Sequence, residues 1–540
     1  MQVDVITDPK ALDGLRENWD RLYEADPEAQ FFLSWTWLAR HLRLYEGTWF
    51  LLAARDGGPG TPYAALMPLR LRTRMNIKTG EFFNEINMAG NYAADYTGAV
   101  CLPELAVAAM QAFGRHLRDM HWTRIHLENL HMSEERLLAM MGQLPSDTLT
   151  AREFLRINKS DNVNNCRCFA ASLPDSFDAY VETVLSSNTR QKLKRFTRKV
   201  DAGQLRITHA DATTIDRDID TLLTFWRTRW GSRKGDRLQS ILRHNRIVLR
   251  TAFDSGSLFM PVLWQGERPL GVLASFVDPV KKAMLFYISG RDETANSTPV
   301  GLILHGHSIR LAIEQGLETY DFLRGDEPYK MAFGVTESRI RCALVATKDG
   351  RNLGDRLDPR TLDSVFAEVT RMHEQGELAR AENGYRQILG TDPRHARALY
   401  GLGQMMSDKG DHQQAQALFA TLAEVAPSAS KVWFRLGAAL QAFGRHDDAA
   451  GAFRKSLALN EDFAGARLML GKSLAAMGQR EQAIDILEDL HHRLEEAPGN
   501  NVLASNTDAL LKELRPEPSS DYLVLTPLQR PAVRASMQAL

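Results

Sequence analysis

The stretch STPVGLILHGHSIRLAIEQGLETYDFLRGDEPYK, residues 297–330, decides the fold of the N-terminal part of the chain. Thr298 is suited to cap a helix, Pro299 to begin it and Gly316 to end it, so a helix is predicted from about 299 to 315. The segment ETYDFL that follows is short and rich in aromatic and apolar residues, which predicts a strand. A strand therefore follows the helix and ends in a charged turn that starts at Arg324.

Three predicted strands precede this helix as an antiparallel meander: SLFMPVLW at 257–264, PLGVLASFV at 269–277 and AMLFYIS at 283–289. The same order of elements is found earlier in the chain, as TWFLLAAR at 48–55, PYAALMPLRL at 62–71, DYTGAVCL at 95–102, a helix at about 104–120 and TRIHLEN at 123–129. We therefore predict a tandem of two strand-rich α/β units, an N-terminal half at 1–160 and a C-terminal half at 161–345.

The C-terminal part of the chain repeats itself every 34 residues. The repeat appears in three sets of positions: Gly376, Gly410, Gly444 and Gly478; Ala381, Ala415, Ala449 and Ala483; and Tyr385, Phe419, Phe453 and Leu487. This period and pattern resemble the tetratricopeptide repeat (TPR), in four units over 362–497. Each unit is predicted to be a helix hairpin, and the stack an all-α solenoid whose curved surface holds a protein partner. A C-terminal tail follows at 498–540; from about 515 it is rich in proline and serine and is predicted to be loose or to dock back on the last helices.

Composition excludes several classes of protein. The 66 basic and 67 acidic residues nearly cancel, which argues against a chain that coats DNA or an anionic membrane. No stretch reaches the 18 apolar residues of a membrane span, and no signal peptide is evident at the start, so a cytoplasmic location is expected. The four cysteines, at 101, 166, 168 and 342, are predicted to be reduced thiols, and no metal site is expected.

Three segments give the N-terminal part a family resemblance. FFLSWTWL (31–38), TRQKLKRFTRKVDAG (189–203) and above all the stretch at 297–330, which ends in YDFLRGDEPYK, resemble the CelD-type acetyltransferases of the GNAT fold. Those proteins are associated with bacterial cellulose biosynthesis and are relatives of the FemAB-like tandem GNAT proteins. The resemblance implies acyl transfer from acetyl-CoA to an acceptor that is polysaccharide-related or a protein and is linked to exopolysaccharide assembly.

The predicted helix start supplies a candidate site for coenzyme A. A helix directs its first free N–H groups, and a partial positive charge, at the loop before it, which suits the pyrophosphate of coenzyme A. We expect Ser297, Thr298, Val300 and Gly301 to bind the cofactor, with Gly301 allowing a close approach. The glycine-rich loop of ordinary GNAT enzymes is absent, and Ser297-Thr298-Pro299-Val300-Gly301 stands in its place.

The turn after the predicted strand supplies candidate catalytic groups. Attack on a thioester needs a base for the acceptor proton and a donor for the departing thiolate. Asp326 or Glu327 is expected to be the base and Tyr329 the donor, with Arg324 and Lys330 binding substrate. Sequence alone does not separate these roles, and a purely structural pairing of Asp321 with Lys330 is an alternative.

The basic segment at 190–199 contains six cations and no acid: Arg190, Lys192, Lys194, Arg195, Arg198 and Lys199. Leu193, Phe196 and Val200 fall on one helical face, so an anchored helix with a cationic outer side is predicted. Such a side suits an anionic partner. The resemblance favours Arg190 and Lys194 as substrate-binding residues.

Three functions are therefore considered. The first is an acyl-CoA-dependent transferase that the TPR units dock to a larger assembly. The second is a FemAB-like transferase that uses aminoacyl-tRNA. The third is a non-catalytic TPR scaffold, because a fold does not guarantee an activity.

Overall fold

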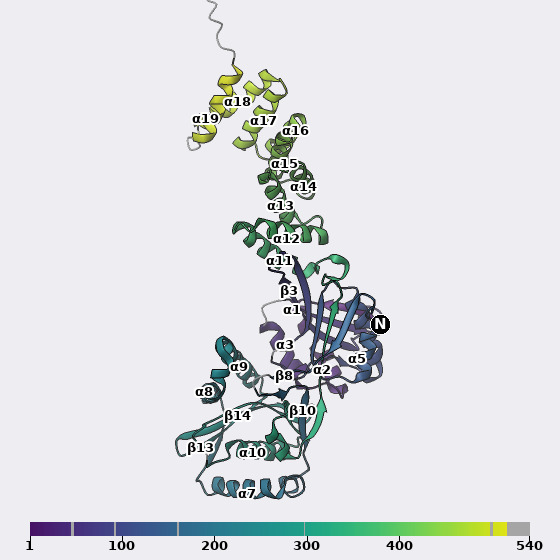
Figure 1. The fold of residues 1–540 in the computed structure, drawn as a ribbon, viewed down its shortest axis with the longest axis vertical. Coiled ribbons are helices and arrows are strands. Elements are labelled where there is room, and N and C mark those ends of the chain that lie inside the picture. The colour runs from purple at the N-terminus through teal and green to yellow at the C-terminus, as the bar shows by residue number, and fades with distance from the viewer. Residues whose placement is uncertain (45–47, 91–92, 159–160, 296, 497–500, 516–540) are drawn as a thin grey trace, which may run out of the picture. The chain divides into compact units, whose positions relative to one another are not determined.

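The computed structural model describes residues 1–44, 48–90, 93–158, 161–295, 297–496 and 501–515 (Figure 1). The chain divides into two compact units, Met1–Val365 and Phe366–Leu540. The first unit mixes helices and strands, whereas the second is helical wherever its secondary structure is described. The fold is therefore a mixed α/β region followed by an all-α TPR region, as the sequence predicts.

The described part of the first unit holds two eight-stranded sheets. The first sheet has the order β1-β2-β3-β4-β6-β18-β7, with β5 beside β3. Its strands are β1 Gln2–Ile6, β2 Thr48–Arg55, β3 Ala65–Met75, β4 Phe82–Met88, β5 Val100–Cys101, β6 Arg124–Leu130, β7 Leu149–Glu153 and β18 Arg341–Thr347.

The second sheet has the order β11-β13-β14-β15-β16-β10-β17, with β12 beside β14. Its strands are β10 Arg167–Ser172, β11 Arg206–His209, β12 Leu258–Phe259, β13 Pro261–Gln265, β14 Arg268–Asp278, β15 Ala283–Arg291, β16 Thr319–Arg324 and β17 Thr336–Arg339. A separate short hairpin joins β8 Ile157–Asn158 to β9 Val163–Asn164.

The two sheets repeat one plan. In each, an antiparallel run ends in a parallel pair whose strands are joined through a crossover helix: β4 and β6 through α4 (Ala106–Arg118), and β15 and β16 through α10 (Val300–Glu314). One detail of the predicted tandem is wrong. The third strand of the first copy is β4 at Phe82–Met88, and the segment 95–102 contributes only β5. The sequence pattern did not indicate β4, because the segment FFNEINM contains polar residues and only one face of the strand is apolar.

The two halves exchange strands at their boundary. β18 pairs with β6 and β7 of the first sheet, and β10 takes the corresponding place beside β16 in the second. The predicted border at 345 therefore falls inside β18, which belongs structurally to the first half. Sequence order cannot reveal this, because strand pairing depends on register across the sheet.

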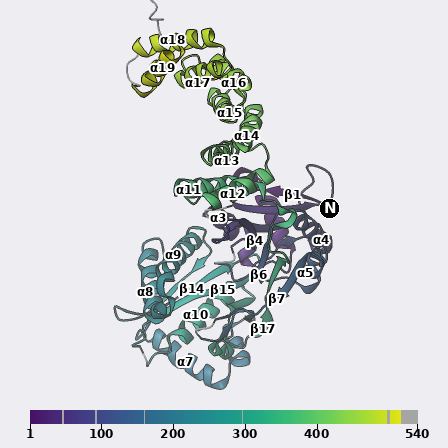
Figure 2. The same cartoon turned by 45° about the horizontal axis from the view of Figure 1, so that its top comes forward.

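Helices cover the faces of both sheets (Figure 2). The remaining α-helices of the first unit are α1 Pro9–Asp13, α2 Arg16–Ala25, α3 Trp35–Leu44, α5 Glu134–Met141, α6 Phe177–Ala179, α7 Ser187–Asp201, α8 Ile215–Lys234 and α9 Leu238–Asp254. One apolar core reaches both sheets: Phe31 stacks on Phe276 of β14 with ring centroids 5.2 Å apart, and Phe32 and Trp37 pack beside them. The aromatic run FFLSWTWL therefore packs at the junction of the two halves.

The second unit consists of paired helices. They are α11 Leu362–Glu374, which begins just before the unit, α12 Leu378–Thr391, α13 Ala396–Asp408, α14 His412–Val425, α15 Ser430–Ala442, α16 His446–Leu459, α17 Ala464–Ala476, α18 Arg480–Glu496 and α19 Asn501–Leu514. A second set of glycines recurs at the same 34-residue spacing, at Gly403, Gly437 and Gly471, and permits close helix contact. A Cβ at Gly437 would lie 2.6 Å from the Phe453 ring, and one at Gly471 2.7 Å from Leu487.

The first part of the predicted tail forms a helix, α19. Leu511 of α19 is buried with Leu487 and Leu490 of α18, so α19 closes the apolar face of the last hairpin. The rest of the tail, from residue 516, lies outside the described residues. Among the described helices, none has the length and apolar character needed to cross a membrane.

Candidate active site

The second sheet opens at its parallel pair. β15 and β16 are paired only over Ala283–Leu285 and Thr319–Asp321. Beyond these positions β15 continues beside β14 as far as Arg291, while β16 continues beside β10 as far as Arg324. The two strands therefore diverge toward their carboxyl ends, and α10 begins in the connection that follows β15.

The amino end of α10 faces open space. The helix begins at Val300 with Pro299 as its cap, one residue later than predicted, and the Thr298 side chain makes no cap hydrogen bond. A Cβ at Gly301 would meet no atom of the described residues within 4 Å. Within the described residues, no acceptor bonds to the N–H of Gly301 or Leu302. These are the orphan donors of a helix start, and they suit an anion.

The predicted cofactor residues differ in what they can offer. Ser297 is exposed and Thr298 half-buried, so their hydroxyls are within reach of a ligand. Val300 is buried, and its side chain fills the space that a Cβ on Gly271 of β14 would need, at 2.4 Å. Val300 therefore anchors the helix start to the sheet and has only backbone atoms for a ligand.

The carboxyl end of β16 is strained and polar. Leu323 adopts a φ of 57°, which an apolar branched residue rarely does. Asp321 supports this turn by accepting the Leu323 N–H at 2.7 Å. It also accepts the Tyr96 hydroxyl, at 2.9 and 3.1 Å to its two oxygens. A rare backbone conformation that is held by such contacts identifies the turn at the end of β16 as a candidate functional site. We call this turn the corner.

Asp321 gives the corner a measurable pH dependence. Burial, above all, raises the pKa of its carboxyl from 3.8 to about 6. The folded chain thus holds the proton to higher pH than the unfolded chain, so this contribution to stability is complete below 3.8 and is lost as pH rises through 6. We expect Asp321→Asn to remove that loss, which amounts to about 1.4 kcal/mol between pH 5 and 7.5 when the pKa rises from 3.8 to about 6. Urea midpoints across this range, followed by tryptophan fluorescence, measure the difference; parallel pH profiles would contradict it.

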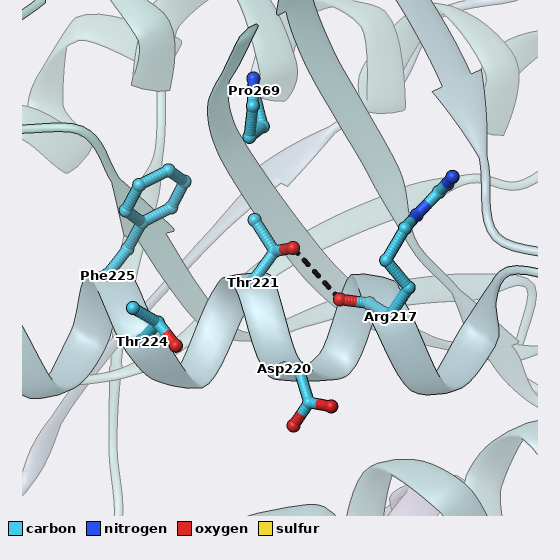
Figure 3. A pocket seen from close by; sticks show the side chains of 6 residues that line it. All are labelled: Arg217, Asp220, Thr221, Thr224, Phe225 and Pro269. Carbon is cyan, nitrogen blue, oxygen red and sulfur yellow. Dashed lines mark hydrogen bonds between the residues drawn. The ribbon is translucent and has the colours of Figure 1, made fainter. Parts of the chain in front are cut away.

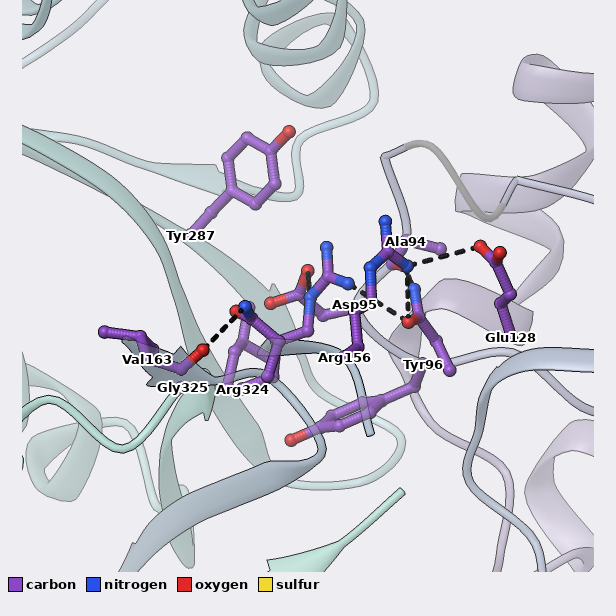
Figure 4. A network of polar contacts seen from close by, with 12 residues as sticks. Ala94, Asp95, Tyr96, Glu128, Arg156, Val163, Tyr287, Arg324 and Gly325 are labelled. Atoms are coloured by element: carbon purple, nitrogen blue, oxygen red, sulfur yellow. Dashed lines mark hydrogen bonds and ion pairs between the residues drawn. The ribbon is translucent and has the colours of Figure 1, made fainter. Parts of the chain in front are cut away.

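Arg324 joins the corner to the first half of the unit (Figure 4). Its Nε donates to Asp95 at 2.6 Å and its Nη1 donates to Asn129 at 3.1 Å. Arg156 donates to the same Asn129 oxygen at 2.9 Å and to Glu128 at 3.3 Å. The guanidinium of Arg324 is thus directed at partners within the protein.

Lys330 is buried and bonded within the protein, whereas the sequence predicted a lysine that is open to substrate. It is 1% exposed, and its ammonium lies 2.9 and 2.8 Å from the carbonyl oxygens of Arg324 and Gly325. Glu327 forms an ion pair with it at 3.0 Å. Asp321 and Lys330 form no ion pair in the described structure; the lysine holds the turn through backbone carbonyls. Because these contacts surround the ammonium, the predicted binding of an anionic substrate by Lys330 does not fit this arrangement.

The two acidic candidates are placed differently. Asp326 accepts the N–H of Asn164 at 2.8 Å and pairs with Arg167 at 3.1 Å. Its pKa is lowered: burial acts to raise it but is outweighed by these two partners. Glu327 pairs with Lys330 and is otherwise open, with 39% of its side chain exposed. Glu327 is therefore the freer of the two to accept a proton.

Tyr329 lies beside Glu327 at the edge of an aromatic cluster. Its ring stacks on His305 of α10, 5.9 Å away, and packs edge-on to Phe322 of β16 at 6.3 Å. Burial, with the charge of Glu327 second, raises the pKa of the Tyr329 phenol well above its usual value. The hydroxyl therefore keeps its proton at neutral pH and, with 43% of the residue exposed, is within reach of a departing thiolate.

The basic helix α7 packs on the outside of α10. Leu193 fills the space beside Gly306, where a Cβ would lie 2.5 Å from it. Arg190 and Lys194 both pair with Glu182, at 2.6 and 2.5 Å. Within the described chain, Lys192, Arg195 and Arg198 have no acidic partner.

Two family models match parts of the chain. Residues 187–331 match the family model described as acetyltransferase (GNAT) domain. The chain carries a GNAT acetyltransferase domain. This domain includes α7, α10, the diverging pair β15 and β16, and the corner at Arg324–Lys330. Residues 372–442 and 440–498 match the tetratricopeptide repeat, so TPR units for protein interaction accompany the GNAT domain.

Several solved structures also resemble part of the chain. A MamA structure from AMB-1 has 24% identity, covers 26% of this chain and 75% of its own, and has a TM-score of 0.24. MamA from Desulfovibrio magneticus RS-1 has 15% identity, covers 26% and 78%, and has a TM-score of 0.25. YrrB, described as a TPR protein with an unusual peptide-binding site, has 24% identity, covers 28% and 77%, and has a TM-score of 0.25. No curated protein matches the chain.

An open pocket of about 620 Å³ lies elsewhere in the GNAT domain (Figure 3). It is lined by Arg217, Asp220, Thr221, Thr224 and Phe225 of α8 and by Pro269 of β14. None of the residues predicted for the site lines it. The described residues contain no cluster of three or more His, Cys, Asp or Glu side chains suited to a metal ion.

The sequence did not indicate the contribution of the first half. Asp95, Tyr96 and Asn129 contact the end of β16 although they lie 229, 225 and 195 residues from their partners in the chain. Asn129 shares with Leu323 a positive φ, of 59°, at the equivalent place in β6. The polar segment NYAADYTG was the sequence signal for this contribution, but it does not indicate which distant residues it contacts.

Proposed function

We propose that the GNAT domain transfers an acetyl group from acetyl-CoA. The observation that supports this most is the amino end of α10, which opens beside the diverging strands β15 and β16 with two free N–H groups at Gly301 and Leu302. A pyrophosphate there would accept these N–H groups and the hydroxyls of Ser297 and Thr298, while the helix dipole adds a favourable field.

We propose that Glu327 and Tyr329 carry the proton transfers. Glu327 removes the proton of the acceptor hydroxyl or amine, whose oxygen or nitrogen then attacks the thioester carbonyl carbon. The C–S bond breaks as the new bond is completed, and the thiolate of coenzyme A takes the Tyr329 proton. Asp326 has less freedom to act, because Asn164 and Arg167 already occupy its carboxylate.

The acceptor is proposed to be a polysaccharide-related molecule of exopolysaccharide or cellulose assembly, or a protein that carries one. The resemblance to the CelD-type transferases supports the first, and the TPR units support a protein partner. Among the predicted substrate-binding residues, Arg324 and Lys330 shape the corner, whereas Arg190 and Lys194 lie on α7 with Glu182 between them.

Calorimetry and a thiol-release assay test this function together. The full-length chain should bind acetyl-CoA and release free thiol when cello-oligosaccharides or amine-bearing peptides are added. Glu327→Gln and Tyr329→Phe should each reduce turnover by about 100-fold or more, with the Kd for acetyl-CoA unchanged.

Asp326→Asn serves as the matched variant and should cost much less. Equal losses in Asp326→Asn and Glu327→Gln would move the base to Asp326. No heat of binding and no thiol release from wild type would leave the domain without transferase function.

Aminoacyl-tRNA remains a second candidate donor because of the cations of α7. Lys192, Arg195 and Arg198 form an outward row without acidic partners in the described chain. Contact with many phosphates makes affinity fall steeply with salt, whereas coenzyme A presents few charges. A steep salt dependence of tRNA binding, lost when these three residues are changed to Gln, would favour this donor.

A further inference from the structure

The first sheet carries a charged face outside the matched GNAT domain. Alternate residues of β3, Leu69 and Leu71, point into the apolar core that α4 covers. The residues between them and beyond, Arg70, Arg72 and Arg74, therefore lie on the opposite face. Three arginines on one strand face are unusual in a sheet that builds a core.

The strand register extends this face across three strands. Arg70 lies opposite Asn87 of β4, which lies beside His126 of β6. Arg72 lies opposite Glu85, which lies beside Arg124. Directly paired residues share a face, so these side chains form one surface. We call it the arginine face: Arg70, Arg72, Arg74, Glu85, Asn87, Arg124 and His126.

Positive charge exceeds negative charge on the arginine face. Glu85 is its one acid, and it contacts Arg74 at 3.5 Å, Arg124 at 3.4 Å and His126 at 3.7 Å. Among the described residues, Arg72 has no ion pair. Burial and, second, the charge of Arg72 lower the pKa of Arg70, as expected for neighbouring like charges.

A buried amide on the same face lacks a partner. Asn87 is 7% exposed, and within the described structure its Nδ2 has no hydrogen-bond acceptor. Leaving such a donor unpaired is unfavourable. His126 next to it likewise has an Nε2 without a hydrogen bond in the described part of the chain. An acceptor that approaches this row would satisfy donors that the folded protein leaves unused.

Solvent reaches this surface. Arg74 and Arg124 keep 55% and 47% of their side chains exposed. The equivalent face of the second sheet is different, because the long helix α8 packs on it so closely that a Cβ at Gly290 would lie 2.6 Å from the Leu222 carbonyl oxygen. The helices α2 and α3 of the first half have 10 residues each, against 20 in α8.

We propose that the arginine face binds an organic oxyanion, the carboxylate or phosphate group of a ligand. Arg72 supplies a planar pair of donors that matches such a group, and Asn87 donates its free amide N–H from the adjacent strand. Alternate residues of a strand are about 7 Å apart, so a second oxyanion at that spacing would meet Arg74. This site is separate from the proposed acyl transfer, because it lies on the first sheet.

Binding measurements on the full-length chain test the proposal at low salt. The probes are inorganic pyrophosphate and trigalacturonate, which distinguish a phosphate from a carboxylate ligand, and maltotriose as a neutral control. All are added with coenzyme A in excess, so that the proposed pyrophosphate site at the start of α10 is already filled. We expect one of the two anions to bind and the neutral sugar not to bind. Arg72→Gln should weaken that binding about tenfold. Arg118→Gln changes an exposed arginine on α4, across the sheet, and should leave it unchanged.

Asn87→Leu distinguishes a role of the Asn87 amide in anion binding from a role in the stability of the fold. Because the variant removes an unsatisfied amide, its melting temperature should equal or exceed that of wild type, while anion affinity falls at least fivefold. Acetyl-CoA affinity should not change in either variant, so failure here leaves the transferase proposal intact. The proposal is overturned if wild type binds neither anion, if Arg72→Gln and Arg118→Gln lose affinity equally, or if Asn87→Leu melts earlier and binds as before.

Discussion

Gly301→Asp should reduce the affinity of the chain for acetyl-CoA by about 100-fold or more. The substitution places a carboxylate at the amino end of α10, where none of the described residues has an atom within 4 Å of the new Cβ. A pyrophosphate bound to the Gly301 and Leu302 N–H groups would meet both its bulk and its charge. Isothermal titration with acetyl-CoA measures the loss, and 100-fold corresponds to about 2.7 kcal/mol.

The substitution should not destabilise the fold, so a loss of affinity would come from the binding site itself. An acidic side chain in the first turn stabilises a helix, so the melting temperature should hold or rise slightly. Gly301→Ala adds only a methyl group and should bind within a fewfold of wild type. Wild-type affinity in Gly301→Asp would remove the start of α10 from the cofactor site.

Asp26→Ala should destabilise the first unit by about 3–5 kcal/mol. Asp26 is fully buried, and its two oxygens accept Nη1 and Nη2 of Arg136 at 2.9 Å each. It also accepts the Cys101 N–H at 2.8 Å. Alanine leaves a buried guanidinium without this partner and an N–H without its acceptor, and both are expensive to bury unpaired.

Urea unfolding followed by tryptophan fluorescence measures this effect in the full chain. Eight of the nine tryptophans precede residue 366, so the signal reports mainly on the first unit. Asp20→Ala removes the exposed ion pair with Arg16 and should leave the midpoint almost unchanged. Similar midpoints for both variants would show that the buried pair contributes little to stability.

Local pattern was enough to find much of the candidate site. The helix start at 299–301 and the corner at 321–330 are contiguous in the chain, and turn, cap and strand signals act over a few residues. Such signals also placed the helix of Leu193 and Phe196 correctly. They could not show that Lys330 is buried against carbonyl oxygens or that Arg167 holds Asp326, because those contacts depend on how β10 and β16 pair.

The sequence by itself determined the periodic features of this protein. Those are the 34-residue helical repeat, the strand meander of the second half and its crossover helix, since each depends on spacing between near neighbours. Only the tertiary structure decided the exchange of β10 and β18, the contact of Tyr96 with Asp321 and the gathering of four arginines on one face of the first sheet. The physical reason is that strand register joins residues far apart in the chain, and a one-residue shift would send each of these side chains to the other face.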